Sequence, residues 1–162
     1  MAQPFVITRT FHAPRQRVWD AWTTLDALLR WFGPTGCTLQ ADALDLRPGG
    51  RFHYALHTPH GVMWGLWTFR EILAPERLVM ETSFSDATGG ITRHPGSATW
   101  PRRILSTTTF AEAGPDTVLT LRWEVLDGDE EEQRTFDGAH EGMTGGWSGT
   151  FAQLDAFLAT AR

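Results

Sequence analysis

The sequence contains no lysine, no asparagine and one cysteine, Cys37, among its 162 residues. Without lysine, the chain has no residue for Schiff-base catalysis or for the lysine of a phosphate-binding loop. Without asparagine, it has no acceptor for N-glycosylation. A single cysteine excludes an internal disulfide and any metal site built from several cysteines. The chemistry of the chain must therefore rest on its other residue types.

Charge and length are those of an ordinary folded domain. The chain has 19 acidic residues against 14 arginines, and this formal net charge of −5 argues against nucleic acid as the main partner. A chain of 162 residues has the length of one domain, and a hydrophobic fraction of 41% is enough to form its core. We therefore expect a single domain over residues 1–162. No signal peptide or membrane-spanning run is visible, so we expect a cytoplasmic protein without a membrane partner.

The hydrophobic pattern predicts a strand, two short helices and then a run of strands. Residues 5–11 alternate as a strand, and Val18 with Trp22, then Leu25 with Leu28, mark the apolar faces of two short helices. Alternation then predicts six strands, over residues 38–46, 51–57, 62–73, 77–85, 103–111 and 117–126. The links between most of them are short, which is typical of an antiparallel meander.

One link, residues 86–102, is much longer than the others. It carries three glycines and two prolines, together with His94 and Trp100. Links of this length in a compact domain are usually lids, binding loops or disordered segments. Because a tryptophan is costly to leave in water, we expect the loop to fold back onto the body of the domain.

The C-terminal third reads as a long amphipathic helix. Asp129 and Glu132 have the spacing of a capping box at its start. Apolar side chains then recur at steps of three and four residues from Phe136 to Leu158. Since glycine weakens a helix, we expect a kink or close backbone packing near Gly145 and Gly146. A curled antiparallel sheet needs cover on one face, so the order predicts an α+β helix-grip fold, with the sheet wrapped around this helix.

The sequence also resembles a known family. It is similar to the AHSA-type branch (activator of heat-shock protein 90 ATPase homologues) of the START-like, Bet-v-like SRPBCC superfamily. The resemblance is carried by residues 9–14 with Val18, Trp19 and Trp22, by residues 31–34, 45–52, 70–72 and 75–79, and by His140, Gly146, Trp147, Leu154, Asp155, Phe157 and Leu158. It implies a START-like cup that encloses apolar ligands, in a family whose members do different things.

Aromatic residues supply the main functional indication. The chain has 8 tryptophans and 10 phenylalanines against one tyrosine. A packed aromatic core and a ligand cavity are both compatible with this inventory, and the cup shape favours the cavity. The candidate ligand-binding residues are Arg9, Trp31, Phe52, Tyr54, Trp67, Phe69, Phe84, Trp100, Trp123, His140, Met143 and Trp147.

Polar candidates are few. Arg9 alternates in step with the apolar residues of its strand, and a buried arginine must be paired, so it needs a partner if it points inward. His140 lies on the apolar stripe of the terminal helix. His53 and His57 share a strand face, but the sequence shows no clear set of further ligands that would complete a metal site with them. We therefore expect no metal site. The sequence shows no convincing catalytic group, and we expect no catalytic residue and no cofactor.

Three functions remain open from the sequence. The leading hypothesis is binding of a small hydrophobic or aromatic molecule between sheet and helix, with Trp100 as a lid and Arg9 and His140 as polar anchors. The second, suggested by the family resemblance, is a chaperone-interacting activator of the heat-shock protein 90 ATPase. The third is an enzyme of the cyclase or aromatase type. We expect a monomer or, through an exposed edge strand, a homodimer.

Overall fold

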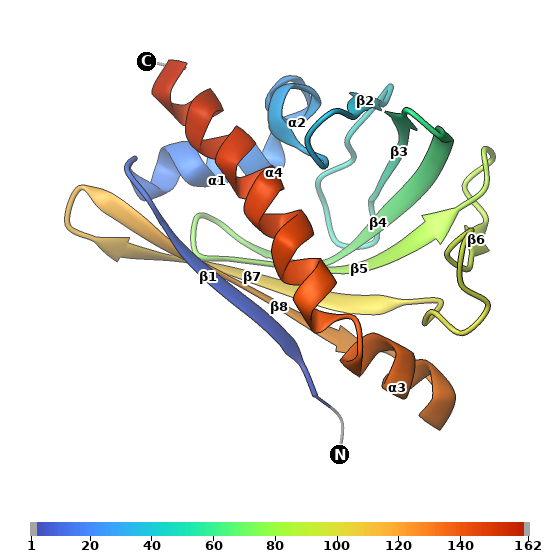
Figure 1. Cartoon of the computed structure of the whole chain (residues 1–162). Helices are drawn as coiled ribbons and strands as arrows, with labels where there is room; N and C mark the ends of the chain where they lie inside the picture. The colour runs from blue at the N-terminus through green and yellow to red at the C-terminus, as the bar shows by residue number, and fades with distance from the viewer. Residues whose placement is uncertain (1–2, 161–162) are drawn as a thin grey trace.

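A computed structural model describes residues 3–160 and shows an α+β helix-grip fold (Figure 1). The helices are α1 (Arg15–Thr23), α2 (Leu25–Trp31), α3 (Glu130–Asp137) and α4 (His140–Thr160). The strands are β1 (Phe5–Phe11), β2 (Thr38–Gln40), β3 (Arg51–Thr58), β4 (Gly61–Leu73), β5 (Arg77–Ser85), β6 (Ile91–Thr92), β7 (Ile104–Ala113) and β8 (Asp116–Val125). The predicted fold class is confirmed.

All eight strands belong to one antiparallel sheet. Its order is β1-β8-β7-β5-β4-β3-β2, with the short β6 paired to β5. The sheet curves, and α4 runs across its inner face (Figure 1). The two faces of the sheet differ in burial, as strand β7 shows. Alternate residues of this strand are buried, and those between them are partly exposed; the buried ones are Ile104, Ser106, Thr108 and Phe110. This period of two places a continuous set of side chains toward α4.

The strand predicted over residues 38–46 is wrong beyond Gln40. After β2 the chain leaves the sheet edge and returns through a tight loop to β3. Gly49 donates to the Phe69 carbonyl at 2.7 Å, and Phe69 donates to the Gly50 carbonyl at 2.9 Å. A side chain on Gly50 would collide with the Asp45 carbonyl, so only glycine permits this close approach. These bonds bind the loop to β4.

The terminal helix is broken, but at a different place from the one predicted. Asp129 and Glu132 form the predicted capping box of α3, which ends at Gly138. Helix α4 then runs without interruption from His140 to Thr160, through Gly145 and Gly146. A side chain at either glycine would meet open space, so the expectation of a kink or close packing there is wrong.

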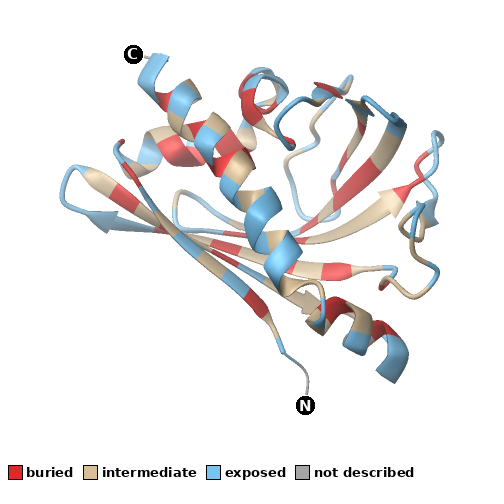
Figure 2. Ribbon diagram, in the orientation of Figure 1, coloured by how far each residue is buried: buried red, intermediate tan, exposed pale blue. Residues whose placement is uncertain are grey.

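The two halves of α4 have different surroundings. Its buried residues, Thr150, Phe151, Leu154 and Leu158, all lie in the C-terminal half, which packs on the core near α1 and α2. Its first turns, around Gly142 and Gly145, are exposed (Figure 2). The helix is therefore anchored at one end, while its N-terminal half stands above the sheet. Within residues 3–160, no helix is both long and apolar enough to cross a membrane.

Candidate functional site

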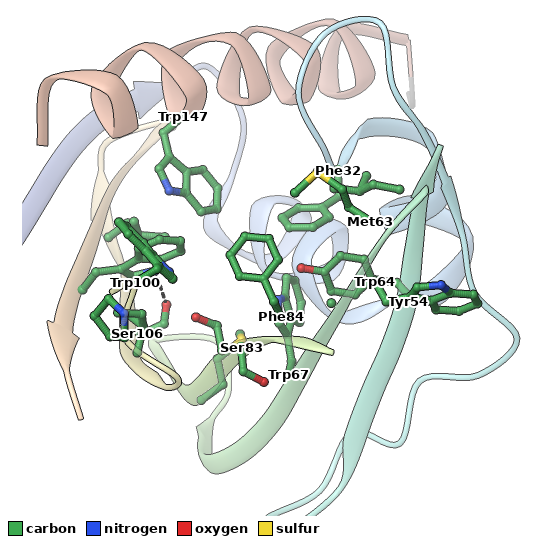
Figure 3. A pocket seen from close by; sticks show the side chains of 18 of the residues that line it. Phe32, Tyr54, Met63, Trp64, Trp67, Ser83, Phe84, Trp100, Ser106 and Trp147 are labelled. Atoms are coloured by element: carbon green, nitrogen blue, oxygen red, sulfur yellow. Dashed lines mark hydrogen bonds between the residues drawn. The ribbon is translucent and has the colours of Figure 1, made fainter. Parts of the chain in front are cut away.

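A cavity of about 150 Å³ lies between the inner face of the sheet and the N-terminal half of α4 (Figure 3). Aromatic side chains make up much of its wall, and the hydroxyl of Tyr54 and the rings of Phe84 and Trp147 point into the same space (Figure 3). The lining residues are Trp22, Phe32, Tyr54, Leu56, Met63, Trp64, Gly65, Trp67, Met80, Thr82, Ser83, Phe84, Trp100, Pro101, Ile104, Ser106, Leu121, Trp123 and Trp147.

A second cavity of about 200 Å³ adjoins the first. The two share five wall residues, Phe32, Tyr54, Leu56, Trp123 and Trp147. The rest of the second cavity is lined by Gly33, Pro34, Met143, Gly146 and Thr150, which come from the segment after α2 and from α4. The space therefore continues outward beside the exposed glycines of α4.

The structure brings seven of the twelve candidate residues to this space. Six of them line the first cavity: Tyr54, Trp67, Phe84, Trp100, Trp123 and Trp147. Met143 lines the second. The other five candidates, Arg9, Trp31, Phe52, Phe69 and His140, line neither cavity.

Three of those five belong to the packed core. Trp31 is 1% exposed, and its indole nitrogen donates to the Ala21 carbonyl at 2.8 Å, which turns the ring away from the cavity. Phe52 and Phe69 are also fully buried. They support Trp67 from behind, with ring centroids 5.0 Å and 6.3 Å from its own. Their role is to hold the wall rather than to form its surface.

Arg9 is paired within the protein. Its guanidinium lies 2.5 Å from the Asp155 carboxylate of α4, and both side chains are about one-third exposed. The sequence indicates that an inward-pointing Arg9 must be paired, and the structure supplies a partner on α4, far away along the chain. Because Arg9 is engaged outside the cavity, the structure gives no support to its use as a ligand anchor.

His140 lies at the junction of α3 and α4. Its ring packs edge-on against Phe5 and Phe136, with centroid distances of 5.7 Å and 5.2 Å. Its Nε2 is buried, and no residue within 3–160 provides a hydrogen-bond partner. The side chain is thus part of the apolar contact that joins the two helices to β1, beside the cavity rather than in its wall.

Sequence reasoning missed several wall residues. Ser106 alternates in step with Ile104 and Phe110, so the period of β7 could have placed it on the inner face. Phe32 packs against Tyr54 and Trp67 at centroid distances of 5.6 Å and 5.0 Å, but it follows α2 in a segment without periodicity. Trp22 is a core residue whose exposure to the cavity depends on tertiary packing alone.

Tyr54 is held in place by the opposite strand. It pairs with Gly65 across β3 and β4, and its ring occupies the space where a Gly65 side chain would stand. Burial raises the pKa of Tyr54 to about 12, and the nearby Trp67 side chain acts more weakly in the opposite direction. The hydroxyl therefore stays protonated at neutral pH and remains a hydrogen-bond donor.

The long loop closes one end of the cavity. Arg93 forms an ion pair with Glu132 of α3 and donates to the Trp100 carbonyl at 3.1 Å. Thr99 and Thr135 are joined through their hydroxyls at 2.8 Å. Trp100 packs on Phe136 with a centroid distance of 5.9 Å. The loop thus folds back as expected, and its contacts fasten it to α3.

The described residues offer no metal centre. Between residues 3 and 160, no group of three histidine, cysteine, aspartate or glutamate side chains is placed to hold a metal ion. His53 and His57 instead bond within the protein, His53 to Ser85 at 3.1 Å and His57 to Gln40 at 2.8 Å.

Comparison with known proteins gives a family and a set of similar structures. Residues 12–159 match the sequence model of the family described as "Activator of Hsp90 ATPase homolog 1-like protein". A solution structure from Arthrobacter aurescens is 28% identical, with a TM-score of 0.81 over 98% of this chain and 87% of that one. A crystal structure from Mycobacterium smegmatis is 26% identical, with a TM-score of 0.77 over 96% and 90%. No curated protein matches the chain.

Proposed function

The chain belongs to the Activator of Hsp90 ATPase homolog 1-like family, and from this premise we propose that it binds a small hydrophobic or aromatic molecule in the cavity between the sheet and α4. The observation that carries the proposal is the pair of adjoining cavities, which share five wall residues and lie under the exposed half of the helix. An apolar cavity of about 150 Å³ is enough for a benzene-sized ring. A larger ligand would extend into the second cavity.

Trp100 is the lid of this site in our proposal. It lines the first cavity, and the loop that carries it is joined to α3 by the Arg93–Glu132 pair and the Thr99–Thr135 contact. Opening the loop would uncover the end of the cavity that these contacts now close. Trp100→Ala is expected to weaken binding while leaving the fold intact, and unchanged affinity would rule out the lid role.

Two other functions have less support. The family's name suggests action on the Hsp90 ATPase, but no particular feature of this structure favours a chaperone partner over a ligand. A cyclase-like or aromatase-like reaction needs groups that move protons. In the part of the chain that the structure describes, the walls of the two cavities carry no carboxylate and no imidazole. Binding is therefore the function that the site supports best.

A neutral fluorescent probe, N-phenyl-1-naphthylamine, tests the proposal. We expect saturable fluorescence enhancement and a rise in melting temperature with probe concentration. At a hundred times its Kd, a ligand adds about 2.7 kcal/mol to the free energy of unfolding. For a chain of this size, that corresponds to roughly 5–10 °C. No enhancement and no shift would overturn the proposal.

Two glycines of α4 provide a matched pair of variants. Gly146 lines the second cavity, whereas Gly145 lines neither, and a side chain at either position meets open space. Gly146→Phe is expected to block probe binding, and Gly145→Phe to leave it unchanged. Both variants should fold, because replacing a helix glycine generally favours the helix. Equal binding by the two variants would place the probe outside the cavities.

A further inference from the structure

The hydrogen-bonding groups of the cavity wall are mostly donors. Six tryptophans line the first cavity, and each carries an indole N–H, which can donate but not accept: Trp22, Trp64, Trp67, Trp100, Trp123 and Trp147. The Trp22 nitrogen is buried, and no residue between 3 and 160 accepts its hydrogen bond. Because this nitrogen is fully buried, a ligand in the cavity does not reach it, and the donors open to a ligand are those of the other wall residues.

Two hydroxyls of the wall, those of Tyr54 and Ser106, are also able to donate a hydrogen bond to a ligand. Ser106 Oγ accepts from the Trp123 indole at 3.1 Å, while the Tyr54 hydroxyl points into the cavity (Figure 3). Ser106 uses an oxygen lone pair in its bond and keeps its own proton, and the Tyr54 hydroxyl also keeps its proton. Among the described residues, no hydrogen bond runs from Tyr54 or Ser106 to a protein acceptor. Both protons are therefore available to a ligand.

Charged groups are missing from the described wall. Neither cavity is lined by an aspartate, glutamate, arginine or histidine of residues 3–160. Arg9 and Glu132 lie outside both walls and are paired with Asp155 and Arg93. An ionised ligand would lose its hydration without gaining a counter-charge, which is strongly unfavourable in an apolar cavity. The wall thus selects against anions, and it would offer a cation only the faces of its aromatic rings.

We propose that the ligand is an uncharged aromatic carbonyl compound, such as an aryl ketone, ester or quinone, whose oxygen accepts a hydrogen bond from Tyr54. The inference rests on the proposed function and specifies the chemical class of its ligand. The aromatic part packs among the rings of the wall. The carbonyl oxygen, an acceptor without a proton or a charge, complements the free donors.

Three naphthalenes of nearly equal size separate this inference from simple apolar binding. They are 2-acetylnaphthalene, which is neutral with a carbonyl, 2-ethylnaphthalene, which lacks the acceptor, and 2-naphthoate, which is an anion. Their Kd values are measured by displacement of N-phenyl-1-naphthylamine. We expect 2-acetylnaphthalene to bind at least about threefold more tightly than 2-ethylnaphthalene, as a net hydrogen bond predicts, and 2-naphthoate to bind most weakly.

One variant tests the donor. Tyr54→Phe keeps the ring over Gly65 and removes the hydroxyl. It is expected to reduce the preference for 2-acetylnaphthalene over 2-ethylnaphthalene, and the Kd of 2-ethylnaphthalene reports any damage to the cavity itself. If 2-ethylnaphthalene binds most tightly, or 2-naphthoate binds as well as the ketone, the inference is wrong while the proposed function stands. If neither the probe nor any naphthalene binds, the proposed function fails as well.

Discussion

The ring of Tyr54 lies over Gly65, its direct partner across the β3–β4 pair. A side chain on Gly65 would overlap the ring carbons and the hydroxyl of Tyr54. Glycine usually weakens a strand because it leaves nothing to pack, and here an aromatic ring from the neighbouring strand fills that space. The pair also fixes where the only tyrosine hydroxyl of the chain enters the cavity.

Gly65→Ala should therefore disturb both stability and binding. The added methyl group forces the Tyr54 ring to move, and we expect a loss of about 1–3 kcal/mol in the free energy of unfolding. Urea unfolding measures the loss, and displacement of the naphthylamine probe measures the effect on the cavity. Gly142→Ala is the control, because its side chain meets open space and it lines neither cavity. Equal stability of the Gly65→Ala variant and the unmodified protein would contradict this account of the pair.

Arg93 is expected to control the mobility of the long loop. It joins the loop to α3 through Glu132 and also donates to the Trp100 carbonyl. Arg93→Gln should speed hydrogen exchange in residues 94–103 while changing global stability by only about 1 kcal/mol, because Arg93 is one-third exposed and Glu132 keeps its bond from the Asp129 backbone. Arg122→Gln removes another arginine–glutamate pair, with Glu124, and serves as the control. Similar exchange in both variants would show that the loop is held mainly by Trp100 and Thr99.

Arg9 is predicted to matter for stability but not for binding. Its ion pair with Asp155 connects β1 to α4 at the side of the domain, away from both cavities. Arg9→Gln should lower the free energy of unfolding by about 1 kcal/mol at most. Probe affinity should remain unchanged, since the guanidinium does not touch the cavity wall. A large loss of affinity at unchanged stability would restore Arg9 as a ligand anchor.

Most of the fold could be predicted from local patterns. Strands β3, β4, β5, β7 and β8 follow alternation, and the capping box at Asp129 and Glu132 marks the start of α3. The apolar stripe that begins at Phe136 gave no sign of the break at Gly138, because the stripe continues in phase across it. The interior glycines led to a wrong prediction of a kink or close packing, since Gly145 and Gly146 lie within a continuous helix.

The candidate site was harder to predict, because its existence depends on distant contacts. Alternation places Trp67 and Trp123 on inner faces, but it cannot tell a packed core from a cavity. That outcome depends on α4, whose second half reaches the core while its first half does not. The partner of Arg9 lies 146 residues away along the chain, beyond any local pattern. Only the assembled fold shows that Trp31 and Phe52 turn away from the cavity.

Tyr54 should make stability sensitive to alkaline pH. Its pKa in the folded protein is raised from 10.0 to about 12, so the folded state holds the phenolic proton more tightly than the unfolded chain does. The resulting stabilisation is fully present below pH 10 and is lost as the pH rises toward 12, when the unfolded chain ionises first. The loss across this range is of order 2–3 kcal/mol.

The composition makes this prediction unusually clean to test. The chain has no lysine and a single tyrosine, so few other side chains change charge between pH 10 and 12. Absorbance at the phenolate band therefore reports Tyr54 alone, and urea unfolding at successive pH values gives the matching free energies. Tyr54→Phe should flatten the stability profile between pH 10 and 12. If the phenol of the folded protein titrates near 10, or the variant keeps the full alkaline loss, then the hydroxyl is hydrated rather than buried in the cavity wall.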